Sequence, residues 1–261
     1  MLVVPWRFRH FIIASIRGEL KARIVRSFFG ATWFILQPMA QALIFALVLS
    51  EVLGARLPQI ENKAAYAIYV LSGMAVWGLF SEIVNRCLTI FVDYSSAIKK
   101  IAFPRLCLPL IVLGSALVNH AMVLVASMVL FIALGHYPGW AWLCLPLGIA
   151  LISAFAFGIG IIAGIFNVFS RDVGQVFAIA LQIWFWLTPI VYPPGTLPLQ
   201  FAWITAFNPL TPMVAIYQRA LLTYESPDLG SLGIPFVVAC GLVMLAVTLF
   251  RRASADLVDA L

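Results

Sequence analysis

The chain has 261 residues, of which 64% are hydrophobic and 10% are charged, and its formal charge is +6. A soluble domain is about half apolar and about a quarter charged, so this composition, with a mean hydropathy of +1.06, excludes a soluble globular protein. The apolar residues form stretches of about 20 without strand-like alternation, which predicts an all-α membrane protein. The basic residues cluster beside these stretches, which favours contact with the membrane over nucleic acid.

Residues 1–30 predict an amphipathic helix that lies in the membrane interface. Apolar side chains recur on one side, at Phe8, Ile12, Ile16, Leu20, Ile24 and Phe28. Basic side chains take the other side, at Arg7, Arg17, Lys21 and Arg26. A basic flank that only orients the first span is the alternative. Charges interrupt the apolar run that a cleavable signal peptide needs, so we expect the N-terminus to stay on the chain.

Six apolar stretches of spanning length follow, at residues 31–54, 65–90, 106–134, 141–168, 174–192 and 231–250. With a cytoplasmic N-terminus, thirteen of the sixteen Lys and Arg residues lie on the cytoplasmic side, and only Arg56, Lys63 and Arg219 lie outside. This bias assigns both termini to the cytoplasm. We expect a single membrane domain over residues 1–261, with spans one to five in 31–192 and the sixth span and a cytoplasmic tail in 231–261.

Residues 193–230 contain two apolar runs that are too short to span, and Asn208-Pro209 divides them. Half-helices lie at membrane depth only where protein or a wet cavity satisfies their freed backbone groups. The segment therefore predicts a helical hairpin that re-enters from the periplasm. Two amphipathic helices resting on the outer surface are the alternative.

A few polar residues interrupt the spans. Glu82 and Arg86 lie four apart on one face of the second span, which predicts an ion pair, with a proton-coupling role as the alternative. Asn119 and His120 in the third span predict polar contacts between helices. Gly160 and Gly164 form a G-x-x-x-G pattern, which predicts close packing of spans within one subunit, with dimerisation of two subunits as the alternative. We interpret the four cysteines as small core residues: Cys87, Cys107, Cys144 and Cys240.

The motifs of catalysis are missing. The sequence has no Gly-Lys dipeptide, so the phosphate-binding G-x-x-x-x-G-K-[ST] loop is absent and the chain cannot be its own P-loop ATPase. The acidic residues are scattered, with no acidic pair or His/carboxylate group for transfer chemistry on a sugar phosphate. We therefore expect no catalytic residue, metal or cofactor on this chain.

Three segments carry a resemblance to a known family. The loop between spans two and three reads AIKKIAFPR at 97–105 and continues with Leu-Pro-Leu at 108–110. The fourth span ends in FNVFSRD at 166–172, and LQIWFWLTPIVYP follows at 181–193. The hairpin contains Asn208-Pro209-Leu210, with Tyr217 and Arg219. Together they resemble permease subunits of ABC transporters that export lipid-linked polysaccharides, among which the Wzm-type O-antigen permeases are the most similar.

The resemblance implies a homodimer of six-span subunits in the bacterial inner membrane. Two nucleotide-binding ATPase subunits would lie beneath it and bind ATP and Mg. A channel for a lipid-linked glycan, O-antigen on undecaprenyl diphosphate, would run along the dimer interface, and the first and fifth spans would form most of its wall. Capsule or teichoic-acid export is the alternative cargo. A secondary transporter coupled to protons through Glu82, Arg86 or His120, and a membrane glycosyltransferase, are the rival functions.

The resemblance also implies roles for individual residues. The loop that couples to the ATPase would contain Ile98, Lys99, Lys100, Phe103, Pro104 and Arg105. Its three basic residues would contact the ATPase or lipid phosphates, and a role as topology determinants only is the alternative. A second cytoplasmic loop would contain Asn167, Arg171 and Asp172. The channel-lining candidates are Trp33, Gln37, Gln182, Trp186 and Pro189. The hairpin would form a periplasmic gate with Pro198, Trp203, Asn208, Pro209, Tyr217 and Arg219.

Overall fold

The computed structural model describes residues 6–25, 32, 36, 40, 44, 63–96, 105–194 and 198–253. Every regular element within these residues is helical, as the sequence predicted. The predicted first span, residues 31–54, lies almost entirely outside this set.

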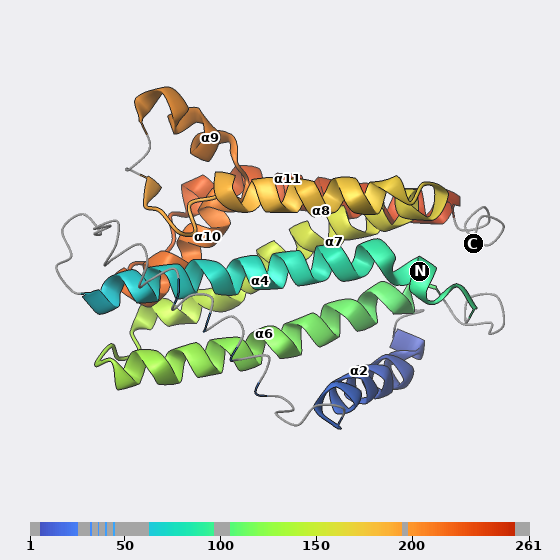
Figure 1. The fold of residues 1–261 in the computed structure, drawn as a ribbon, viewed down its shortest axis with the longest axis horizontal. Coiled ribbons are helices and arrows are strands. Elements are labelled where there is room, and N and C mark those ends of the chain that lie inside the picture. The colour runs from blue at the N-terminus through green and yellow to red at the C-terminus, as the bar shows by residue number, and fades with distance from the viewer. Residues whose placement is uncertain are drawn as a thin grey trace.

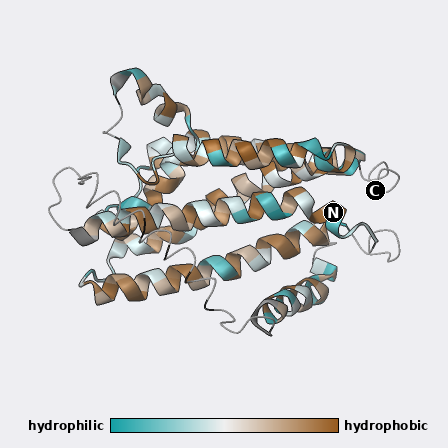
Figure 2. Ribbon diagram, in the orientation of Figure 1, coloured by the Kyte–Doolittle hydropathy of each residue, from teal (hydrophilic) through white to brown (hydrophobic). Residues whose placement is uncertain are grey.

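Four helical segments are long and apolar enough to cross a membrane. They contain α4 (Lys63–Asp93), α6 (Cys107–Ala133), α7 (Leu145–Phe169) with the preceding 3-10 turn η2 (Trp140–Cys144), and α11 (Gly233–Ala253) with the preceding turn η6 (Leu229–Leu232). They coincide with the predicted second, third, fourth and sixth spans to within a few residues. The helices run side by side (Figure 1), and most of their residues are hydrophobic (Figure 2).

The predicted fifth span, residues 174–192, corresponds to the shorter helix α8 (Asp172–Leu187). Its 16 residues cover about 24 Å, less than the roughly 30 Å of bilayer hydrocarbon. The predicted end at residue 192 is wrong because Thr188, in extended conformation at ψ 135, precedes Pro189, which has no N–H to continue the helix. Residues 188–192 are irregular, and we call them the α8 break.

The centre of the bundle is the contact of α7 with α4 on one side and with α11 on the other. A Cβ atom on Gly160 would lie 2.7 Å from Cys87 Cβ, and one on Gly164 would overlap the carbonyl oxygen of Cys87. A Cβ atom on Gly158 would lie 2.8 Å from Leu242 Cβ on α11. The predicted packing of the G-x-x-x-G pattern within one subunit is therefore confirmed.

The predicted hairpin forms short helices that break at Asn208 and Pro209. They are η4 (Leu199–Phe201), α9 (Ala202–Phe207), α10 (Leu210–Gln218) and the π-helical turn η5 (Arg219–Thr223). No residue of α9 is buried, and α9 stands away from the bundle in Figure 1. Six of the nine residues of α10 are buried, against α4 and α7. The two halves of the segment thus have different environments.

The N-terminal helix α2 (Arg9–Val25) lies outside the bundle and contacts α6 (Figure 1). A Cβ atom on Gly114 of α6 would overlap the Ile16 side chain, so the glycine lets α2 approach closely. Helix α2 lies within the predicted amphipathic segment, residues 1–30.

Candidate functional site

The α8 break is held by hydrogen bonds from α4 and α10. Tyr66 Oη donates to the carbonyl oxygen of Val191 at 2.6 Å. Tyr69 Oη lies 3.0 Å from the carbonyl oxygens of both Pro189 and Tyr192. Gln218 Nε2 also donates to the Pro189 carbonyl, at 3.0 Å. Side chains of α4 and α10 thus donate to three carbonyl oxygens of the irregular segment, at Pro189, Val191 and Tyr192.

Asn208 joins the end of α8 to the start of α10. Its side-chain oxygen accepts hydrogen bonds from Trp184 Nε1 and from the Leu210 backbone N–H, each at 3.0 Å. Its Nδ2 donates to Thr188 Oγ1 at 2.9 Å and to the Leu187 carbonyl at 3.2 Å. Asn208 is 8% exposed, so this one side chain positions both helix ends inside the protein.

Tyr217 anchors α10 in the middle of the bundle. Its side chain is fully buried, and its Oη lies 2.8 Å from Nε2 of His120 on α6. A Cβ atom on Gly148 of α7 would lie 2.8 Å from the Tyr217 ring, so the ring needs a glycine there. The predicted polar contact of His120 between helices is confirmed.

An aromatic clasp at the far end of the hairpin consists of His136 and Tyr224. Their rings stack at 4.7 Å, and His136 Nε2 donates to the Leu221 carbonyl at 2.5 Å. Tyr224 has a left-handed backbone, at φ 58, and its Oη donates to the Tyr137 carbonyl at 2.6 Å. Burial raises the pKa of the Tyr224 hydroxyl above its usual value. The clasp ties η5 to the loop between α6 and α7.

A second polar cluster, which we call the α2 anchor, connects α2 to α4 and α6. Arg86 Nη2 lies 2.6 Å from Glu19 Oε2, and Arg86 Nη1 lies 3.5 Å from Glu82 Oε1. Ser115 Oγ donates to Glu19 at 2.7 Å, and Asn119 Nδ2 donates to Glu82 at 2.7 Å. The predicted Glu82–Arg86 ion pair and the contact of Asn119 are confirmed. Sequence reasoning missed Glu19, although it is the single acidic residue among the first 50.

The candidate residues of the two loops predicted to be cytoplasmic lie in different environments. Asn167 is buried, donates through Nδ2 to the Leu88 carbonyl at 3.0 Å and accepts from the Gly174 N–H at 3.1 Å. It therefore fixes the turn between α7 and α8 on α4. Arg171 and Asp172 are exposed at that turn, and Arg105 is half-buried before α6. Ile98, Lys99, Lys100, Phe103 and Pro104 lie outside the described residues.

The channel-lining candidates do not share one surface. Gln182 and Trp186 lie on an exposed face of α8 that also carries Ile179 and Ile183. Pro189 is buried in the α8 break, away from this face. Trp33 and Gln37 lie outside the described residues.

The gate candidates also divide. Asn208 and Tyr217 are buried contacts of the bundle, whereas Pro198, Trp203 and Arg219 are exposed and Pro209 is half-buried. Sequence reasoning missed three donors to the α8 break: Tyr66, Tyr69 and Gln218. The spacing of the two tyrosines, three apart on one helical face, was the available signal.

The described cysteines form no disulfide, and only two of them are buried. Cys87 and Cys107 are buried, Cys144 is half-buried and Cys240 is exposed. The interpretation of all four as core residues is wrong for Cys240, which is exposed on α11. Among the described residues, no three His, Cys, Asp or Glu side chains are grouped as metal ligands.

Comparison with known proteins adds a family and relatives. Residues 10–222 match the model of the family described as ABC-2 type transporter. The O-antigen export system permease protein RfbA of Myxococcus xanthus is 26% identical over 258 residues, which cover 98% of this chain and 97% of the relative. An RfbA protein of Klebsiella pneumoniae is 28% identical over 82% of each chain. The polysialic acid transport protein KpsM of Escherichia coli is 22% identical over 78% of each chain.

Proposed function

Because the chain belongs to the ABC-2 type transporter family, a family of membrane-spanning subunits, we propose that it is the permease of an ATP-driven exporter of lipid-linked polysaccharide. The proposed cargo is O-antigen on undecaprenyl diphosphate. The observation that carries this proposal is the similarity to an O-antigen export permease along 98% of the chain. The long apolar helices agree with a multi-pass membrane protein.

The proposed assembly is a homodimer above two ATPase subunits, which bind ATP and Mg. Only Leu181 is buried among the residues of α8, so most of this apolar helix is not covered by the described part of its own chain. A second copy facing Ile179, Gln182 and Trp186 would enclose a conduit there. The aromatic and amide side chains suit a glycan because flat rings stack on sugars and amides bind hydroxyl groups.

The proposed topology has six spans in a bacterial inner membrane and both termini in the cytoplasm. Arg171, Arg251 and Arg252 support it because they lie at the same end of the bundle, at the end of α7 and the end of α11. The ATPase would bind at this end, through residues 98–105 and the turn at Arg171 and Asp172. The hairpin would then lie at the periplasmic end.

The proposed gate has a fixed part and a mobile part. Helix α10 is the fixed part because Asn208 and Tyr217 hold it in the bundle. Helix α9 is the mobile part because none of its residues is buried, so few packing contacts oppose its movement. Trp203 and Pro198 would move with α9 as cargo leaves the conduit.

The central proposal is tested by co-expressing the chain with a soluble P-loop ATPase from a gene next to its own. We expect the two proteins to co-purify, and ATP hydrolysis to require both the partner and an intact P-loop lysine in it. Export is measured as surface glycan in a strain that lacks its own O-antigen permease. The proposal would be contradicted if the ATPase neither co-purified with the chain nor changed its activity in its presence. It would also be contradicted if the surface glycan stayed at the level of the strain without a permease.

Capsule export is the second candidate function because KpsM, a polysialic acid transport protein, is 22% identical over 78% of the chain. Parallel complementation of strains that lack an O-antigen permease or a capsule permease, each with the cognate ATPase, separates the two cargoes. Proton coupling is tested in inverted membrane vesicles from these strains, to which a protonophore is added. Export that stops with the proton gradient while ATP remains high would favour a secondary transporter.

A further inference from the structure

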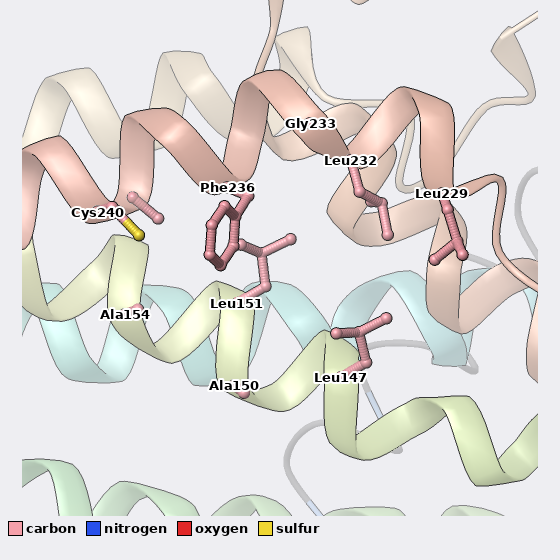
Figure 3. A pocket seen from close by; sticks show the side chains of 10 residues that line it. Leu147, Ala150, Leu151, Ala154, Leu229, Leu232, Gly233, Phe236 and Cys240 are labelled. Carbon is pink, nitrogen blue, oxygen red and sulfur yellow. The ribbon is translucent and has the colours of Figure 1, made fainter.

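A groove of about 340 Å³ lies between α7 and α11 on the surface of the bundle (Figure 3). Its lining is apolar on both sides, from Leu147, Ala150 and Ala154 on α7 to Gly233, Phe236 and Cys240 on α11. The two helices make a close contact at Gly158 and Leu242, beyond the groove. Toward the N-terminal ends of α7 and α11, small side chains leave the space between the two helices unfilled.

Water is a poor occupant of this groove. Its volume equals that of roughly ten water molecules, each of which needs two to four polar partners. The ten lining residues are Leu, Ala, Gly, Phe and Cys, and none carries a charged or amide side chain. An apolar occupant is therefore favoured.

The groove is open toward the surface that the membrane covers. Phe236 is 61% exposed and Leu147 is 45% exposed, although both belong to segments of spanning length. The groove follows the helices from Leu147 to Ala154, about 10 Å at the helical rise of about 1.5 Å per residue. One leaflet contributes about 15 Å of hydrocarbon, so the length and direction fit part of a lipid chain.

The groove lies toward one leaflet. It is formed by the first halves of α7 and α11, whereas Arg171, Arg251 and Arg252 lie at their opposite ends. In the topology proposed above, that position is the outer leaflet. The groove is formed by α7 and α11, so it is separate from the exposed face of α8, where the conduit is proposed.

We propose that the α7–α11 groove binds one acyl chain of an outer-leaflet phospholipid as a fixed structural lipid. Helices in a bilayer associate through van der Waals packing, and an unfilled gap forfeits those contacts. An acyl chain restores contacts to Ala150, Ala154 and Phe236 at once. The inference rests on the proposed orientation in the membrane and is independent of the exported cargo.

The test fills the groove with a side chain. Ala150→Phe occupies the space of the acyl chain, and Ala121→Phe makes the same change at an exposed position of α6 away from the groove. The probe is palmitoyl-oleoyl phosphatidylethanolamine, added to delipidated protein and counted by native mass spectrometry. We expect about tenfold weaker phospholipid binding for Ala150→Phe, and wild-type binding for Ala121→Phe.

Thermal unfolding gives a second measurement. Added phospholipid should raise the unfolding temperature of the wild type and of Ala121→Phe, and leave that of Ala150→Phe unchanged. Ala154→Leu, a smaller filling change, replaces Ala150→Phe if that variant fails to fold. Equal phospholipid binding and response in all variants would overturn the proposal.

A diazirine on the acyl chain of the probe locates the binding site. We expect labelled peptides from residues 147–154 and 232–240. Undecaprenyl phosphate tests a prenyl chain as the occupant, and its displacement of the probe at equal concentration would overturn the phospholipid assignment. Oxidation to a dimer linked through Cys240 would show that a second copy covers the groove, which would also overturn it.

Discussion

Arg86 is the residue on which the α2 anchor depends, because it faces both Glu19 and Glu82. Removing one partner of a buried ion pair costs about 3–5 kcal/mol, and exposed pairs contribute about 0–1 kcal/mol. The anchor lies between these cases because its charged side chains are 18–20% exposed. We expect Arg86→Met to lower the free energy of unfolding by about 2 kcal/mol, measured by thermal unfolding in lipid nanodiscs.

Glu19→Gln is the matched variant for Arg86→Met. It leaves Arg86 beside Glu82, so its loss should be about half as large, and the effects of the two changes combined should not add. Proteolysis within α2 should increase in both variants because the helix loses its polar attachment. Unchanged stability and proteolysis in both would show that the anchor does not hold α2.

Asn208 is the second residue with a large expected effect. Asn208→Ala removes two donors and one acceptor, and leaves Trp184 Nε1 and the Leu187 carbonyl without these partners. Each buried unsatisfied group costs about 1–3 kcal/mol, so we expect a loss of about 3 kcal/mol in unfolding free energy. The control is Thr205→Ala, because the Thr205 hydroxyl bonds only to a nearby backbone carbonyl at the protein surface. Equal stability of the two variants would contradict the role of Asn208.

At the scale of elements, the contact of α4 with α7 depends on glycine. Gly164→Leu would place a side chain against the Cys87 carbonyl, which is backbone and cannot move away without separating the helices. We expect this variant to lose most folded protein, measured as the monodisperse fraction after purification. Gly241→Leu on α11 is the control, because a Cβ atom there meets nothing within 4 Å. Its yield should equal that of the wild type.

The different environments of α9 and α10 predict different chemical accessibility. In a variant without the four native cysteines, a membrane-impermeant maleimide should label Thr205→Cys on α9 quickly and Thr211→Cys on α10 slowly. The reason is that Thr211 Oγ1 is buried, whereas the Thr205 hydroxyl is exposed. Labelling of Thr205→Cys should also change when the complex is trapped with ATP. Identical labelling in both states would show that α9 does not move with the ATP cycle.

Elements were predictable from sequence where local physics dominates. The starts and ends of α4, α6, α7 and α11 follow from apolar length, because backbone in hydrocarbon must hydrogen-bond within its own helix. The break at Asn208-Pro209 follows from the missing N–H of proline. The end of α8 was placed too late, because Ile190, Val191 and Tyr192 continue the apolar pattern after the helix has already ended at Leu187.

For the whole molecule, the loop at residues 98–105 should couple ATP hydrolysis to export. The triple variant Lys99→Glu/Lys100→Glu/Phe103→Ala should insert and fold normally, yet lose most export while the partner still hydrolyses ATP. The physical reason is that reversed charges repel the surface that the basic loop contacts. Surface glycan and ATP hydrolysis are measured on the same purified or reconstituted complex.

The control for this variant is Arg56→Glu/Lys63→Glu, which reverses two charges that the proposed topology places outside. It should leave export near the wild-type level, because these residues do not face the ATPase. Normal export by a stably expressed triple variant would remove the coupling role from residues 98–105.

The sequence by itself determined that the protein lies in a membrane, that it is helical and where most of its spans lie. It also determined the resemblance to polysaccharide exporters. These depend on composition, on the apolar length of each segment and on local motifs, all of which act within a short stretch of chain. Only the tertiary structure decided that Tyr66 caps the α8 break, 125 residues away, and that Glu19 meets Arg86, 67 residues away. Such contacts depend on how the helices pack side by side, and a one-dimensional pattern contains no distance between them.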